Sequence, residues 1–178
     1  MPIFEETEYR HDPLTMETIE KRPCRETGAP GRRILAVAAW RSEDRALRAL
    51  LSALKEQIPC AFELINLESP ADVHFRMSSR ALFNRIRLYD AVVFVLPGSD
   101  FASSPALGLP EERLPFKRHF LRLIPAGYLI DGSPTPRLEA AVEAHARAWR
   151  LLPLGLATNE EGGTGLESLA TALLRAIE

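Results

Sequence analysis

The chain has 178 residues, enough for one domain with a single core, and its 46% hydrophobic and 26% charged residues are ordinary for a soluble globular protein. Its 22 basic and 24 acidic residues give a net charge of -2, so charge supplies no reason to expect a nucleic acid partner. No apolar run is long enough to span a membrane, and the acidic N-terminus lacks the apolar core of a signal peptide.

The two cysteines, Cys24 and Cys60, lie far apart and match no metal-binding or redox spacing. We therefore expect free thiols in a reducing compartment, without a disulfide. Together with the missing signal peptide and membrane span, this predicts a cytoplasmic protein with no membrane partner.

Residues 1–32 differ in composition from the rest of the chain, because Glu, Arg, Pro and Thr surround isolated apolar residues. We interpret this segment as an N-terminal arm and linker before a domain at 33–178; a disordered tail is the alternative. An arm anchored by Ile3, Phe4 and Tyr9 would pack on another surface. This predicts a homo-oligomer or a protein partner bound through the arm.

From Arg33 onward, apolar runs typical of buried strands alternate with segments of helical spacing. The first strand is ILAVAAW, and Ser42 is the expected N-cap of a helix at 43–57. AVVFVLPGSD gives the strongest strand signal, and the proline-rich stretch 97–115 reads as a long loop. The remaining expected elements are strands within 61–69, 127–133 and 153–160, and helices within 79–90, 115–124, 136–152 and 165–177.

This alternation predicts an α/β fold with a flavodoxin-like, doubly wound, five-stranded parallel sheet. We expect the strand that starts at Ile34 in the centre, with the strand that starts at Ala91 beside it, because both are apolar on two faces. In this fold a ligand binds at the carboxyl ends of the first and third strands.

Several local features resemble the NAD(P)H-dependent FMN reductase family. They are RILAVAAW with its following helix, YDAVVFVLP, the Ser-x-Pro in SSP and the lysine in FKRHF. The resemblance implies FMN as cofactor, NAD(P)H as reductant, a loop around the FMN phosphate after the first strand and a loop along the flavin ring after the third. It assigns no catalytic residue. The matched positions are Arg41, Ser42, Pro97, Ser103, Pro105 and Lys117. The candidate cofactor-binding residues are Trp40, Arg41, Ser42, Arg45, Pro97, Gly98, Ser99, Asp100, Phe101 and Ser103.

The turn after the first strand departs from the family pattern. No glycine occurs between Gly31 and Gly98, and the turn is about three residues shorter than the family loop. Glu43 and Asp44 occupy the expected first turn of the helix, where they would repel a phosphate. Either the turn caps the helix N-terminus with its own side chains and binds no phosphate, or it is a modified phosphate loop that relies on Arg41 and Arg45.

Trp40 would point into the crevice beside Pro97 and Phe101, where it either stacks on a ligand or fills the ligand's space. Two functions follow from these alternatives. One is a divergent flavin-dependent oxidoreductase with weakened FMN binding. The other is a cofactor-free interaction or assembly subunit. The missing glycines favour this second function, in which the site binds no flavin.

Other residue patterns are weaker. The histidines have no metal-ligand spacing, and we expect His145 on the exposed face of its helix. Ser99, His119 and Asp131 have the residue types of a Ser-His-Asp catalytic triad. However, the sequence lacks the G-x-S-x-G motif that carries the serine nucleophile in α/β-hydrolases. EEGGTG at 160–165 lacks the Lys-Ser/Thr of a P-loop, which favours a turn with Thr164 or Gly165 near a helix cap.

Overall fold

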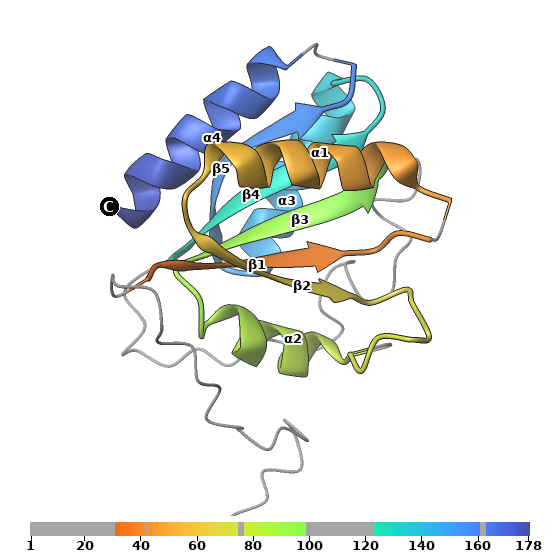
Figure 1. Ribbon diagram of the computed structural model, residues 1–178, viewed down its shortest axis with the longest axis vertical. Helices are drawn as coiled ribbons and strands as arrows, with labels where there is room; N and C mark the ends of the chain where they lie inside the picture. The colour runs from red at the N-terminus through yellow and green to blue at the C-terminus, as the bar shows by residue number, and fades with distance from the viewer. Residues whose placement is uncertain (1–30, 42, 75–76, 99–122, 161–162) are drawn as a thin grey trace, which may run out of the picture.

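A computed structural model describes residues 31–41, 43–74, 77–98, 123–160 and 163–178. Its core is a five-stranded sheet in the order β2-β1-β3-β4-β5, with all neighbouring strands parallel (Figure 1). This strand order is that of the flavodoxin-like doubly wound fold, so the predicted fold class is confirmed. In chain order the elements are β1 (Arg33–Ala38), α1 (Arg45–Gln57), β2 (Ala61–Asn66), α2 (Ser79–Ile86), β3 (Ala91–Pro97), β4 (Ile124–Asp131), α3 (Pro136–Ala148), β5 (Leu151–Thr158) and α4 (Thr164–Ile177).

Strands β1 and β3 are adjacent, parallel and interior, as their apolar sequences predict. Ile34 pairs with Ala91, and the register continues to Ala38 and Val95. The strand in the middle is nevertheless β3 and not β1, because β4 and β5 both lie on the far side of β3. The expected central position of the first strand was wrong by one place.

Successive side chains of each strand point to opposite faces of the sheet, and they form an apolar layer on each face. Helices α1 and α4 cover one face, where they pack on Ile34, Ala36 and Val93. Helices α2 and α3 cover the other face, which includes Leu35 and Phe94. Figure 1 shows α1 and α4 side by side across the first of these faces. The helices cover the two faces, so the carboxyl ends of the strands form the edge of the sheet where a ligand of this fold would bind.

Helix α1 begins two residues later than predicted. Asp44, and not Ser42, occupies its N-cap position, and no acidic residue lies in its first turn. Ser42 itself lies outside the described residues. The expected cap at Ser42 was therefore wrong, as was the placement of Glu43 and Asp44 inside the helix.

Other boundaries shift because strand pairing overrides local propensity. Ile124 belongs to β4, so the helix expected at 115–124 does not extend that far, and its residues up to 122 fall outside the described part of the chain. Helix α3 stops at Ala148, and Arg150 turns the chain with a positive φ of 55°. Leu151 then starts β5.

His145 is buried, in contrast to the exposed position expected from the sequence. Only 3% of it is exposed, because it shares the inner side of α3 with Val142 and packs near the fully buried Trp149, the C-cap residue of this helix. Its Nδ1 lies 2.9 Å from the hydroxyl oxygen of Tyr128, and its ring meets Phe94 edge to face. Burial raises the pKa of the Tyr128 hydroxyl well above its usual value. The histidine therefore belongs to an aromatic core.

No helix in the described ranges is both long and apolar enough to cross a membrane.

Candidate functional site

The turn between β1 and α1 uses its polar groups internally. The carboxylate of Asp44 accepts a hydrogen bond from the backbone N–H of Arg41 at 2.7 Å. In return, the N–H of Asp44 donates to the carbonyl of Arg41 at 3.2 Å, and the N–H of Arg45 donates to the carbonyl of Glu43 at 2.7 Å. The acidic side chain that was expected to repel a phosphate thus helps to close the turn.

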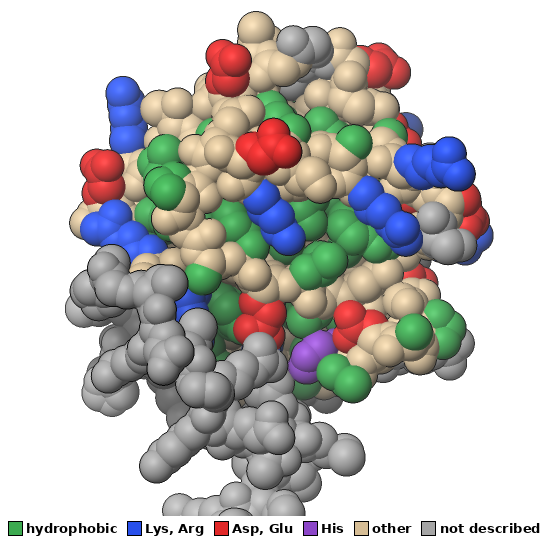
Figure 2. Space-filling model, in the orientation of Figure 1, with side chains coloured by type: hydrophobic (Ala, Val, Ile, Leu, Met, Phe, Trp, Pro, Cys, Tyr) green, Lys and Arg blue, Asp and Glu red, His purple; other side chains and the backbone are tan. Residues whose placement is uncertain are grey.

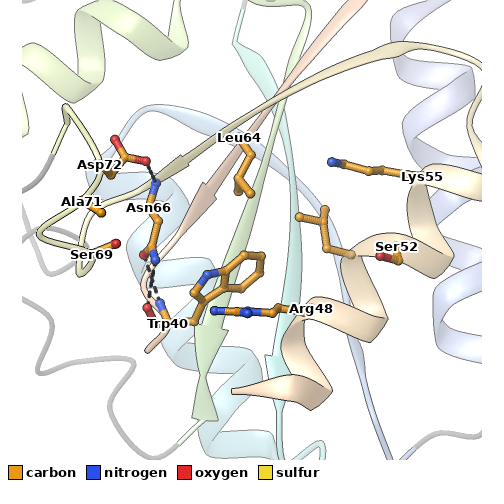
Figure 3. A pocket seen from close by; sticks show the side chains of 10 residues that line it. Trp40, Arg48, Ser52, Lys55, Leu64, Asn66, Ser69, Ala71 and Asp72 are labelled. Atoms are coloured by element: carbon orange, nitrogen blue, oxygen red, sulfur yellow. Dashed lines mark hydrogen bonds between the residues drawn. The ribbon is translucent and has the colours of Figure 1, made fainter. Parts of the chain in front are cut away.

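The residue before this turn is held by Asn66, the last residue of β2. The Asn66 side chain donates to the carbonyl of Trp40 at 3.0 Å and accepts from the Trp40 N–H at 3.3 Å (Figure 3). The backbone N–H of Asn66 donates to Asp72 at 2.9 Å, which ties in the loop after β2. Only 9% of Asn66 is exposed, so these hydrogen bonds lie in the protein interior. Together they fix the path of the chain out of β1.

These contacts decide how well the turn suits a phosphate. A phosphate at a helix N-terminus is held by backbone N–H groups that point at it, and glycine lets the chain approach closely. Here the N–H groups of Trp40, Arg41 and Arg45 already donate within the chain. The described part of this turn therefore does not fit the phosphate of FMN without rearrangement. The side chains of Arg41 and Arg45 are exposed beside it.

Trp40 points to the α1 side of the sheet, where only 6% of it is exposed. The guanidinium of Arg48 lies 5.7 Å from the centre of its ring. The ring lines an open hollow of about 520 Å³ between α1 and β2, here called the β2 hollow (Figure 3). The hollow is lined by Trp40, Arg48, Leu51, Ser52, Lys55, Leu64, Asn66, Ser69, Ala71 and Asp72.

A second hollow, of about 480 Å³, lies at the carboxyl ends of β3 and β4 and is here called the β3–β4 hollow. Trp40 is not among its lining residues, so Trp40 and the Pro97–Gly98 turn face different hollows. Its lining residues are Pro97, Gly98, Asp131, Gly132, Ser133, Thr135 and Leu138.

Gly98 is required here by close packing. A Cβ atom on Gly98 would collide with the backbone carbonyl of Asp131, since Pro97 pairs with Asp131 in the sheet. The chain next to the hollow is also tied together, because the N–H of Gly132 donates to the side chain of Asn159 at 2.9 Å. Gly98 therefore lets the ends of β3 and β4 lie close to each other.

The candidate residues fall into three groups. Trp40, Arg41 and Arg45 lie around the β1–α1 turn, whereas Pro97 and Gly98 lie at the end of β3. The remaining candidates lie outside the described residues: Ser42, Ser99, Asp100, Phe101, Ser103, Pro105 and Lys117. Sequence reasoning missed Asn66 and Asp72, and the only available signal was an asparagine within an expected strand.

The other patterns add no described site. Among the described residues no group of His, Cys, Asp and Glu is arranged to hold a metal ion. Asp131 lines the β3–β4 hollow, but Ser99 and His119, the other two residues of the hypothetical catalytic triad, are outside the described residues. Gly163, with a φ of 97°, is the N-cap of α4, and Thr164 and Gly165, the two residues expected near the cap, directly follow it.

No protein-family model matches the sequence, and no curated protein matches it. Among solved structures, the two-electron reduced flavodoxin of Megasphaera elsdenii is 12% identical, with 79% of this chain and 98% of that chain covered, at a TM-score of 0.47. The general stress protein 14 of Treponema denticola, in complex with FMN, is 13% identical, with 82% and 97% covered, at a TM-score of 0.49. Both scores are below 0.5, so the fold assignment rests on the strand order itself.

Proposed function

We propose that this flavodoxin-like protein is an interaction or assembly subunit that works without a flavin cofactor. The observation that carries the proposal is the closed β1–α1 turn, in which Trp40, Arg41 and Arg45 donate their N–H groups within the chain. Each such hydrogen bond contributes about 0.5–1.5 kcal/mol, so freeing them for a phosphate would reduce its affinity.

The β3–β4 hollow favours a second candidate, a divergent flavin-dependent oxidoreductase with weakened FMN binding. This hollow lies at the strand ends where ligands of the fold bind, beside Pro97 and Gly98. Bound FMN would accept hydride from NAD(P)H, while the protein would orient the ring. The phosphate would then depend on the side chains of Arg41 and Arg45. The closed turn makes this the weaker of the two candidates.

Titration of the purified full-length chain with FMN separates these candidates. Flavin fluorescence reports binding, and NAD(P)H absorbance reports any reductase turnover. We expect no binding at micromolar FMN and no FMN-dependent oxidation of NAD(P)H. Arg41→Ala tests the phosphate contact, and Arg147→Ala, an exposed arginine on α3, is the matched control. Sub-micromolar affinity that is lost in Arg41→Ala but kept in Arg147→Ala would replace the subunit proposal with the reductase.

The proposed partner is a protein, either a second copy or another chain, bound through the arm at 1–32. The arm supplies apolar anchors at Ile3, Phe4 and Tyr9, and the near-neutral charge of the chain gives nucleic acid no advantage. A cytoplasmic location belongs to the same proposal.

A further inference from the structure

The two edges of the sheet differ in how they are guarded against another strand. The β5 edge contains Pro153, which cannot donate a backbone hydrogen bond, and Gly155 beside a register shift opposite Ala126 and Gly127. In β2, by contrast, every residue from Ala61 to Asn66 pairs with β1 in unbroken register, without proline. The β2 edge is therefore the better template for an added strand.

The surface beside β2 combines apolar and basic side chains. Leu64 is 39% exposed, and the ammonium of Lys55 lies 5.7 Å from the centre of the Phe62 ring. Arg48 lies at the same distance from the Trp40 ring. Figure 2 shows this face, with blue basic side chains on both sides of a green apolar area. Within the described ranges, neither Arg48 nor Lys55 forms an ion pair.

The acidic residue of β2 does not offset these cations. Glu63 pairs with Arg85 of α2, on the opposite face of the sheet. Asp72 does line the β2 hollow, but its carboxylate accepts hydrogen bonds from the backbone N–H groups of Asn66 and His74. An antiparallel pairing of this edge with the same edge of a second copy would bring basic side chains towards each other. The chemistry that fits is an extended segment with carboxylates and apolar side chains.

The chain itself contains such a segment outside the described residues. Residues 3–9, IFEETEY, carry three glutamates between Ile3, Phe4 and Tyr9. We propose that residues 3–9 of one copy dock along β2 of a second copy, with the glutamates at Arg48 and Lys55 and an apolar side chain in the β2 hollow. A reciprocal exchange would use two such contacts in each dimer.

The described chain starts at the amino end of the β2 edge. The guanidinium of Arg32 donates to the carbonyl of Glu178 at 2.5 Å, and the adjoining Arg33 pairs with Ala61, the first residue of β2. Exchange between two copies gives a dimer, whereas a segment that docks in its own chain gives a monomer, so mass in solution separates the two.

The test uses charge reversal in the full-length chain, with mass in solution measured by light scattering across a concentration series. One variant reverses the hollow, Arg48→Glu with Lys55→Glu, and the other reverses the segment, Glu5→Lys, Glu6→Lys and Glu8→Lys. Each variant alone should weaken dimerisation about tenfold or more. Arg147→Glu, on the opposite face, is the matched control and should dimerise like the unmodified chain. Circular dichroism and urea unfolding check that each variant is folded.

Mixing the two reversed variants is the decisive step. In the mixture both contacts are complementary again, so a heterodimer should form with nearly the affinity of the unmodified protein. A monomeric unmodified chain, an unchanged dimer in either variant or failure of the mixture to associate would each overturn the proposal.

The proposal rests on the interaction-subunit function, but the two can fail separately. Tight FMN binding would remove that function, whereas the mixing experiment concerns only the arm and the β2 edge. A monomer that binds no FMN would leave a different protein as the partner.

Discussion

Replacement of Asn66 by alanine should destabilise the protein because the Asn66 side chain holds the backbone of Trp40. The amide donates to the Trp40 carbonyl at 3.0 Å and accepts from the Trp40 N–H at 3.3 Å. Its oxygen also accepts from the N–H of Glu68 at 3.3 Å. Trp40 is 6% exposed, so water has little access to the groups that the substitution leaves behind.

The expected loss follows from those two backbone groups. A buried polar group left without a partner costs about 1–3 kcal/mol, and the two groups of Trp40 share one local environment. We therefore expect Asn66→Ala to lower the free energy of unfolding by about 2–4 kcal/mol, a large share of the roughly 5–15 kcal/mol that is typical of a domain.

Urea unfolding followed by circular dichroism measures this loss, with an unchanged slope showing that the compactness of the end states is the same. Asn84→Ala is the matched control, because Asn84 is half-buried on α2 and has no hydrogen bond from its side chain to another described residue. The control should change stability by less than about 0.5 kcal/mol. If Asn66→Ala lowers the free energy of unfolding as little as the control does, the hydrogen bonds from Asn66 to Trp40 do not hold the turn, which refutes this prediction.

Two further predictions concern packing and pH. Gly98→Ala should destabilise the fold by about 1–3 kcal/mol in thermal unfolding, because the new methyl group collides with the Asp131 carbonyl; Pro97→Ala is the neighbouring control, and equal effects would contradict the packing argument. Burial, together with a hydrogen bond to Glu63, raises the pKa of Tyr89 to about 12. The unfolded chain releases this proton near pH 10, so stability should fall as the pH rises from about 10 to 12. Tyr89→Phe should make that fall less steep, and an unchanged slope would show that Tyr89 is not its source.

The sequence alone determined the class of fold. The apolar runs around Ile34 and Ala91 require burial on both faces, and helical spacing between the runs leaves few arrangements other than a covered parallel sheet. It also favoured a self-capped first turn over a modified phosphate loop, because glycine is absent there. Both inferences depend on residue types and spacing, which are local properties of the chain.

Tertiary structure decided the position of individual side chains. The sequence led us to expect His145 on the exposed face of its helix, and only packing against Phe94 and Tyr128 placed it in the core. The cap of α1 moved to Asp44, and the clamp on Trp40 came from Asn66, 26 residues away. Such contacts join segments that are distant in sequence, and no local pattern encodes which partner will arrive. That is the physical reason why the sequence predicted the sheet, whereas only the folded chain showed how its candidate site is closed.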